Sequence, residues 1–397
     1  LNSYMGLNKK NIIFLFLVSF FISTALIFFV DQKESTLKLN EIILTKTIYS
    51  ELPGWQNAEI YTAKKAFKAS CRSIQKKDSS DIINFFDVLI DINAYKSFCI
   101  KIDKTNNSRE LKNLIESSFY LVKIEDTKKK ALFTGYIELE LKGRLEPSFL
   151  EAPNAVPIYK KPNNLITLDL GLFKEELKNK KIKGFIEGDK FVPAATRGEI
   201  EKQDLFKDNI LAYIDDPARA YFLHIQGSGI IELPSGKNIS VGYDGDNGQD
   251  YFSIGRSLIK DGIIPKEKIS MQSITKWMQE NEEEAIALRH KNKRFIFFKD
   301  RKKDGPLGSS GLIVTPMHSA AVDKSVLPYH LPLWANVKDF YTEGDSQSYA
   351  NLIIAQDTGS AIKGATRIDL FLGKGEAAEM IAGKLNSRGS LWAFIPK

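Results

Sequence analysis

The pattern of hydrophobic and polar positions divides this chain into segments in which apolar residues recur with different periods. Between residues 56 and 120, apolar positions recur at helical spacing, as in the run from Ile82 to Ile90 and the run from Leu111 to Phe119. These stripes predict helices whose apolar faces pack into a core.

From about Leu132 onward the apolar runs become short and are separated by Gly, Pro, Asn and Asp, as in "ALFTGYIELEL" and "YFLHIQGSGIIELPSG". Short apolar runs separated by turn-forming residues are typical of strands and turns. One helical interval is predicted at about 265–289, and short strands are predicted again from 294 to the C-terminus. The pattern as a whole predicts a mainly β protein with helices, of the α+β class.

A long apolar run, Ile12 to Val30, contains no charged residue and follows Lys9 and Lys10. As a helix it is ~28 Å long, which matches a hydrocarbon core of ~30 Å. The run predicts a membrane anchor or a signal peptide, and its length and the missing small-residue cleavage site favour the anchor. The preceding lysines place everything after it outside the cytoplasm. No cysteine lies near the end of the run, so the sequence does not support attachment of a lipid through an N-terminal cysteine.

Composition narrows the class of protein. The 397 residues are 43% hydrophobic and 26% charged, and the net charge of +7 is scattered in short runs that we interpret as solvated faces rather than a nucleic-acid stripe. This modest basic bias suits an anionic polymer as partner. Cys71 and Cys99 are either bridged in an oxidising compartment or buried as free thiols. The four histidines lack zinc-ligand spacing, so we expect no metal or cofactor.

The segment "IIAQDTGSAIKGATRIDLFLG" holds two candidate carboxylates, Asp357 and Asp369. The triplet that begins at Asp357 is similar to an aspartic-protease turn, but such a site requires a second turn or a homodimer, and the chain contains no other Asp-Thr-Gly or Asp-Ser-Gly. Gly359 and Gly364 have phosphate-loop spacing without the lysine that such a loop needs. Neither alternative is favoured.

Asp369 differs from an ordinary turn aspartate because it lies inside the alternating, strand-like run "RIDLFLG". Apolar neighbours remove water from a carboxyl group and raise its pKa. An acid that stays protonated near neutral pH can serve as a general acid in a cleft. The segment "QGSG" at 226–229 lacks the Gly-x-Ser-x-Gly pattern of serine hydrolases, and it fits a tight turn between strands or a backbone that approaches a ligand closely.

Several ordered phrases carry a family resemblance over residues 130 to 397. They are "FTGYIELEL", "VPIYKKP", "ATRGEIE", "DPARAYFLHIQGSGIIELPSG", "VGYDGDNGQDYFSIGRSLI", "GPLGSSGLIVTP", "AVDKSVLP" and "AQDTGSAIKGATRIDLFLGKGEAAEMIAG". Together with the exported location, they resemble the membrane-bound lytic transglycosylase A family, whose members cleave murein and end in a 3D domain.

The resemblance implies a double-psi β-barrel domain with a second, β-rich domain inserted into it, after an N-terminal transmembrane helix. On this chain the expected divisions are 12–30 for the anchor, 40–156 and 298–397 for the discontinuous barrel, and 157–297 for the insertion. The substrate would lie in the groove between the two domains.

The resemblance also implies an activity and a site. The enzyme would cleave the β-1,4 bond between N-acetylmuramic acid and N-acetylglucosamine in peptidoglycan and form 1,6-anhydromuramic acid. Asp369 matches the acid/base, and Asp357 and Asp323 match two supporting signature aspartates. The expected substrate-binding residues are Thr134, Gly135, Tyr136, Gln226, Gly227 and Ser228.

The expected partners are peptidoglycan glycan strands and, through the N-terminal helix, a membrane, with no nucleic acid and a monomeric chain. The expected location is the periplasmic face of a bacterial membrane, with an inner-membrane anchor favoured over an outer-membrane lipoprotein. The competing hypothesis is a non-catalytic murein-binding barrel similar to expansins. An acidic residue in the groove favours the enzyme, because a pure binder needs no proton donor.

Overall fold

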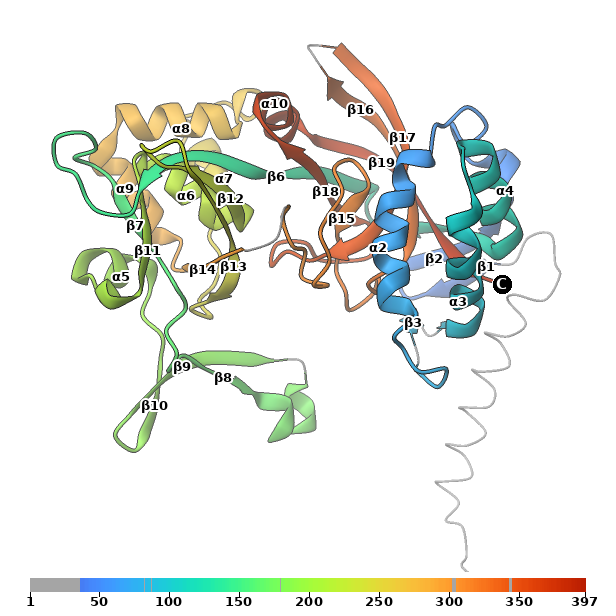
Figure 1. The fold of residues 1–397 in the computed structure, drawn as a ribbon, viewed down its shortest axis with the longest axis horizontal. Coiled ribbons are helices and arrows are strands. Elements are labelled where there is room, and N and C mark those ends of the chain that lie inside the picture. The colour runs from blue at the N-terminus through green and yellow to red at the C-terminus, as the bar shows by residue number, and fades with distance from the viewer. Residues whose placement is uncertain (1–35, 82, 87, 179, 302–304, 343–344) are drawn as a thin grey trace, which may run out of the picture.

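The computed structural model describes residues 36–397 except 82, 87, 179, 302–304 and 343–344. The predicted anchor at 12–30 lies outside these residues. None of the helices in the described part is both long enough and apolar enough to cross a bilayer. Two lobes lie side by side, as Figure 1 shows.

One lobe is built on strands that close on themselves. The ring runs from β19 through β16, β17, β15, β18 and β6 and back to β19. Its members are β6 (Ala131–Arg144), β15 (Ser319–Ala321), β16 (Pro332–Thr342), β17 (Asp345–Asp357), β18 (Arg367–Lys374) and β19 (Asn386–Pro396). Beyond β19 the sheet continues through β5 (Phe119–Asp126), β2 (Ile42–Thr47) and β1 (Thr36–Leu39). The chain thus forms a barrel from one early strand and from strands between Ser319 and Pro396.

A layer of helices covers one side of this barrel (Figure 1): α2 (Lys64–Ile74), α3 (Ile92–Lys101) and α4 (Ser108–Ser118). A disulfide joins Cys71 of α2 to Cys99 of α3, so the pair that the sequence left open is bridged. The predicted helix at 82–90 is wrong, because β3 (Ile83–Phe85) and β4 (Val88–Ile90) form a hairpin there. Phe86 has a φ of 48° at its turn, and both strands bury alternate residues, a period that helical spacing imitates over so short a run.

Strand β6 connects the two lobes. Its first part pairs with β18 of the barrel, and Leu139 to Lys142 pair with β12 of the second lobe. At this junction Glu138 accepts a hydrogen bond from Arg301, and both side chains are buried. Figure 1 shows β6 running from one lobe into the other. The residues on β6 are therefore shared between the barrel and the second lobe.

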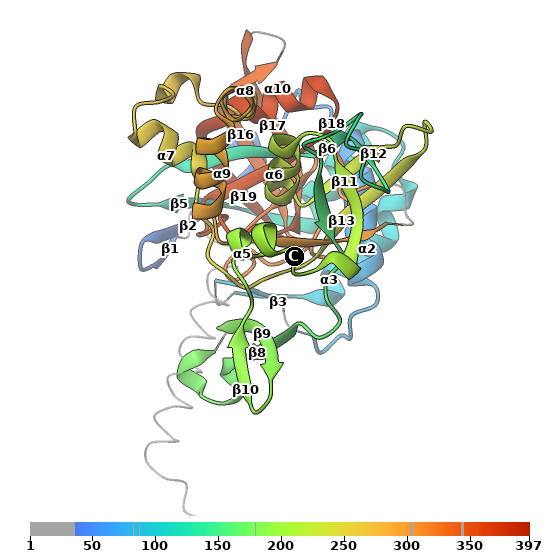
Figure 2. The same cartoon turned by 90° about the vertical axis from the view of Figure 1, so that its left-hand side faces the viewer.

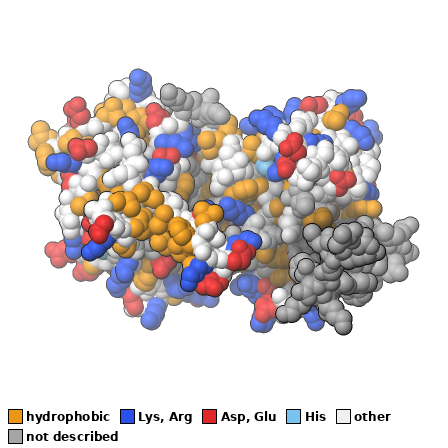
Figure 3. Space-filling model, turned by 90° about the horizontal axis from the view of Figure 1, so that it is seen from below, with side chains coloured by type: hydrophobic (Ala, Val, Ile, Leu, Met, Phe, Trp, Pro, Cys, Tyr) orange, Lys and Arg blue, Asp and Glu red, His pale blue; other side chains and the backbone are white. Residues whose placement is uncertain are grey.

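The second lobe combines a sheet with several helices. Its strands are β7 (Val156–Tyr159), β11 (Ile210–Ile214), β12 (Ser228–Glu232), β13 (Asn238–Asp246) and β14 (Ile296–Asp300). Its helices are α5 (Arg197–Gln203), α6 (Pro217–Gln226), α7 (Ile254–Lys260), α8 (Met271–Glu280) and α9 (Glu282–Lys291). A separate sheet of β8 (Ile166–Asp169), β9 (Lys181–Glu187) and β10 (Lys190–Pro193) projects from this lobe, as Figure 2 also shows. Seen from below, the surface is hollowed between the lobes, and hydrophobic side chains gather on the second lobe (Figure 3).

The helices α5, α6, α7 and α10 lie where strands were predicted, and the predicted helical interval at 265–289 is divided. The expected strand texture at 217–226 is instead α6, which the Asp216 side chain caps by accepting from the backbone of Ala218 and Arg219. The single interval at 265–289 is divided at Asn281 into α8 and α9. A further helix, α10 (Glu376–Lys384), lies within the C-terminal strands. An aspartate before a proline at the first helical position is an N-terminal signal, but β-branched and aromatic residues around it favoured a strand.

Candidate active site

The two candidate carboxylates come from strands on either side of β15. Ala321 of β15 pairs with Asp357 of β17 on one side and with Asp369 of β18 on the other. Asp369 also pairs with Thr134 of β6. Side chains of directly paired residues point to the same face of a sheet, and neighbouring strands are about 4.8 Å apart. The register therefore brings two carboxylates and one hydroxyl to one face of the barrel wall.

Asp369 lies in the environment expected of a proton donor. Its Oδ1 accepts a hydrogen bond from the hydroxyl of Thr134. Burial raises the pKa of Asp369 and the negative charge of Asp357 adds to this, whereas the bond from Thr134 and the charge of Arg367 act in the opposite direction. The net shift is upward, so the acid form persists to higher pH than in an ordinary aspartate.

Asp357 is held by a dense set of donors. Tyr136 donates its hydroxyl to Oδ2 at 2.8 Å, and Oδ1 accepts from the backbone N–H of Ser309 at 2.8 Å, the Ser309 hydroxyl at 2.9 Å and the N–H of Thr358 at 2.8 Å. Several short hydrogen bonds to one carboxyl group restrict its rotation. The Tyr136 hydroxyl has a raised pKa because it is buried and faces the charge of Asp357. The side chain of Asp357 is therefore held in a fixed orientation by four hydrogen bonds.

Asp323 holds the loop that connects the strands of the two carboxylates. Its side chain accepts from the hydroxyl of Ser325 at 2.7 Å and from the N–H of Gly364 at 2.9 Å. Burial acts to raise the pKa of Asp323, but the hydrogen bonds from Gly364 and Ser325 outweigh it and the pKa is lowered. Gly364 has a φ of 94°, which a residue with a side chain rarely adopts. Asp323 thereby fixes the loop that leads from Asp357 to Asp369.

The predicted groove segments meet on β6. Gln226, the last residue of α6, accepts a hydrogen bond from the N–H of Ile137 at 2.9 Å, next to Tyr136. Gly227 caps α6 with a φ of 78°, so "QGSG" joins a helix to strand β12 and does not join two strands. Ser228 begins β12 and is buried.

Gly135 faces the opposite side of β6 from Thr134 and Tyr136. An added Cβ there would lie 2.3 Å from Leu372 Cδ1, so a larger residue would displace the side chain of Leu372. The predicted residues thus fall into a group around the carboxylates, on β6, β17 and β18, and a group at the end of α6.

Apart from Tyr136, the sequence did not single out the groups that hold Asp357 in place. Ser309 provides two of its hydrogen bonds, and Tyr329 donates its hydroxyl to Ser309 at 2.9 Å. Gln356, which precedes Asp357, is fully buried and hydrogen-bonded to α2. Ser309 lies in the segment "GPLGSSGLIVTP", which carries part of the family resemblance. The local sequence does not indicate which of its two serines contacts a carboxylate.

Comparisons with known proteins identify the family. Residues 132–299 match the MltA specific insert domain and residues 318–395 match the 3D domain. A membrane-bound lytic murein transglycosylase A homolog from Buchnera aphidicola is 30% identical over 372 residues, which are 92% of this chain and 83% of that protein. The chain belongs to the membrane-bound lytic murein transglycosylase A family.

Members of this family also share the fold. The crystal structure of MltA from Neisseria gonorrhoeae matches with a TM-score of 0.76 at 28% identity, over 92% of this chain and 96% of that one. MltA from Escherichia coli with bound chitohexaose matches with a TM-score of 0.63 at 26% identity, over 85% and 91%. The mixed α+β architecture is therefore that of the MltA structures.

Proposed function

We propose that this protein is a lytic transglycosylase that cleaves the β-1,4 bond between N-acetylmuramic acid and N-acetylglucosamine and leaves a 1,6-anhydromuramic end. The observation that carries the proposal is Asp369, a carboxyl group with a raised pKa on the face that the register shares with Asp357 and Thr134. Family membership and the chitohexaose bound by the E. coli relative support a glycan strand as substrate.

The proposed reaction uses Asp369 twice. Its proton moves to the glycosidic oxygen as the bond to muramic C1 breaks, and an oxocarbenium-like centre develops at C1. The ionised Asp369 then takes the proton of the muramic C6 hydroxyl, whose oxygen attacks C1 within the same sugar. This attack replaces the water and second catalytic carboxyl group of a hydrolase, because an intramolecular hydroxyl has a high effective concentration. The proton returns to Asp369, and atoms and charge balance.

The remaining site residues have supporting roles in this proposal. The fixed negative charge of Asp357 raises the pKa of Asp369 and favours positive charge developing nearby. Asp323 holds the intervening loop. The hydroxyls of Thr134 and Tyr136 would bind sugar hydroxyl and N-acetyl groups. The backbone at Gly135 and the segment from Gln226 to Ser228 would contribute further contacts to the glycan.

Finer features of the architecture belong to the same proposal. The closed ring of strands supports a double-psi β-barrel formed by 40–156 and 298–397, with 157–297 inserted. The apolar run at 12–30 supports an inner-membrane anchor that holds the enzyme at the periplasmic face. The bridge between Cys71 and Cys99 agrees with an oxidising compartment.

The test is to incubate the protein with purified murein sacculi and to determine product masses. Anhydromuropeptides from the wild type, lost in Asp369→Asn, are expected. Asp189→Asn is the matched control, because Asp189 is an exposed aspartate on the projecting sheet. Products with reducing ends would replace this mechanism by hydrolysis, and an absence of soluble product with retained binding to sacculi would favour the non-catalytic barrel.

A further inference from the structure

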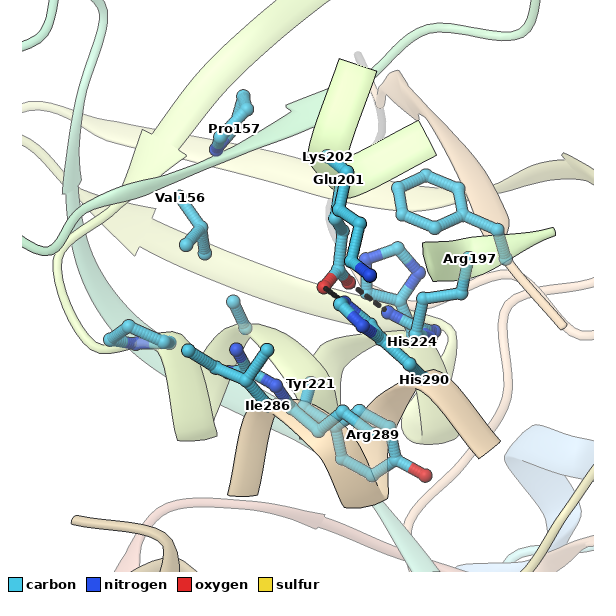
Figure 4. Close-up of a pocket in the computed structure, with 13 residues that line it drawn as sticks. Val156, Pro157, Arg197, Glu201, Lys202, Tyr221, His224, Ile286, Arg289 and His290 are labelled. Carbon is cyan, nitrogen blue, oxygen red and sulfur yellow. Dashed lines mark hydrogen bonds and ion pairs between the residues drawn. The ribbon is translucent and has the colours of Figure 1, made fainter. Parts of the chain in front are cut away.

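A second candidate site lies in the inserted lobe, away from Asp369. A cavity of about 260 Å³ lies between α5, α6 and α9, close to the start of β7. Figure 4 shows the charged residues of these helices converging on it. None of its lining residues belongs to the carboxylate site on the barrel.

One ion-pair network in this cavity is centred on Arg197 and Glu201, and the Nε of Arg197 is buried without a hydrogen-bond partner among the described residues. Arg197 is almost fully buried and donates from Nη1 to Glu201 Oε1 at 2.9 Å and from Nη2 to the carbonyl of Arg294 at 2.9 Å. The other oxygen of Glu201 lies 3.1 Å from His290 Nε2. Burial acts to raise the pKa of Glu201, but the bond to His290 and the arginine charges lower it to about 2. Glu201 is therefore ionised, and both of its oxygens are engaged.

Arg289 is left without a partner in this arrangement. Among the described residues, its guanidinium has no hydrogen bond and no ion pair, and its Nε is buried and unsatisfied. Burial lowers the pKa of Arg289 and the charge of Arg197 adds to this, while Glu201 opposes it. Arg197, Arg289 and Lys202 line the cavity with one anion, Glu201, between them. Arg289 is half-buried, and its buried Nε has no hydrogen-bond acceptor among the described residues, so an anionic ligand would complete the site.

Several other lining residues are apolar, and they indicate what kind of group the second half of the ligand carries. Val156, Pro157, Ala220 and Ile286 contribute aliphatic side chains. His224 adds no charge, because burial holds its pKa well below its usual value and its Nδ1 accepts from the N–H of Ile296 at 3.0 Å. A guanidinium fork matches the planar geometry of a carboxylate. The aliphatic wall suits a small apolar group attached to that carboxylate.

We propose that this cavity binds the carboxylate end of a short peptide with small apolar side chains, recognised by Arg289. The choice of the murein stem peptide as its source rests on the proposed function. Helix α6 carries the cavity residues Pro217 to His224 and ends at Gln226, so the cavity lies within about 13 Å, along the helix, of the contact between Gln226 and β6. An extended peptide of four or five residues spans about 13 to 17 Å. A stem peptide on a muramic sugar in the groove is therefore long enough to reach the cavity.

The test measures binding by titration calorimetry on the full chain, with N-acetyl-D-alanyl-D-alanine, its C-terminal amide and inorganic phosphate as probes. Saturable binding of the free acid, at least tenfold weaker for the amide and for phosphate, is the expected result. Arg289→Gln should weaken binding of the acid at least tenfold, while Arg289→Lys should lose less. Lys291→Gln is the matched control, because Lys291 is an exposed cation on the same helix outside the cavity. Circular dichroism confirms that each variant is folded.

The proposal is overturned if the free acid fails to bind, if amide or phosphate binds as tightly, or if Arg289→Gln binds like the wild type. A second measurement compares cleavage of peptide-bearing strands with cleavage of strands stripped of peptide by an amidase. A preference for peptide-bearing strands that Arg289→Gln removes and Lys291→Gln keeps supports the stem peptide as source. Equal cleavage of both substrates by the wild type refutes that source but leaves the transglycosylase intact. Cleavage of neither strand, with acid binding retained, refutes the activity alone.

Discussion

Gln356 links the helical layer to the active site, and its removal gives a quantitative test of the structure. The side chain is fully buried and makes three hydrogen bonds: it donates to the Ala66 carbonyl and the Ser70 hydroxyl, each at 2.8 Å, and accepts from the Ser319 hydroxyl at 2.6 Å. Gln356→Met keeps approximately the same volume and removes all three. At about 1 kcal/mol for each bond, the free energy of unfolding should fall by about 3 kcal/mol.

The loss is measurable by urea unfolding with linear extrapolation. Gln272→Met is the matched control, because Gln272 is exposed and its amide makes one hydrogen bond, to the carbonyl of Glu379. We expect a loss below about 0.5 kcal/mol for this control. Since Gln356 precedes Asp357, we also expect reduced kcat on sacculi. A loss under about 1 kcal/mol for Gln356→Met would refute the assigned network, because three buried bonds cannot be removed from a fixed core at so small a cost.

Three further outcomes follow from the same structure. Replacing Cys71 and Cys99 together by serine should lower the free energy of unfolding by about 3 to 4 kcal/mol, because the bridge closes a loop with a sequence separation of 28 residues. Denaturant unfolding of the variant and of the oxidised protein measures this difference. An unchanged midpoint would show that the bridge does not constrain the unfolded chain. If protonated Asp369 is the active form, activity is present below its pKa and is lost as pH rises through it. Thr134→Val removes a bond that lowers this pKa, so the alkaline limb of the pH–rate profile should move to higher pH. Asp357→Asn removes a charge that raises the pKa of Asp369, so the alkaline limb of the pH–rate profile should move to lower pH. Shifts of the same sign in Thr134→Val and Asp357→Asn would exclude Asp369 as the titrating acid.

Local pattern was sufficient for many elements and misleading for some. The alternation in "RIDLFLG" predicts a strand, and Asp369 lies inside β18 with the raised pKa expected from apolar neighbours. The helical stripe from Leu111 to Phe119 is confirmed by α4, which ends at Ser118. The hairpin of β3 and β4 and the helix α6 were misread, because short apolar runs fit both periods and tertiary packing decides between them.

By itself, the sequence determined the α+β class, the family and the candidate carboxylates, since these depend on local periodicity and on ordered phrases. Only the tertiary structure decided which groups meet. Thr134 bonds Asp369 across 235 positions and Tyr136 bonds Asp357 across 221, through a register that no local run encodes. The same is true of the bridge between the two cysteines and of Arg289, whose Nε has no hydrogen-bond partner among the described residues. Contacts between distant segments depend on how strands and helices pack. The residue types on either side of such a contact do not indicate which distant residue each will meet.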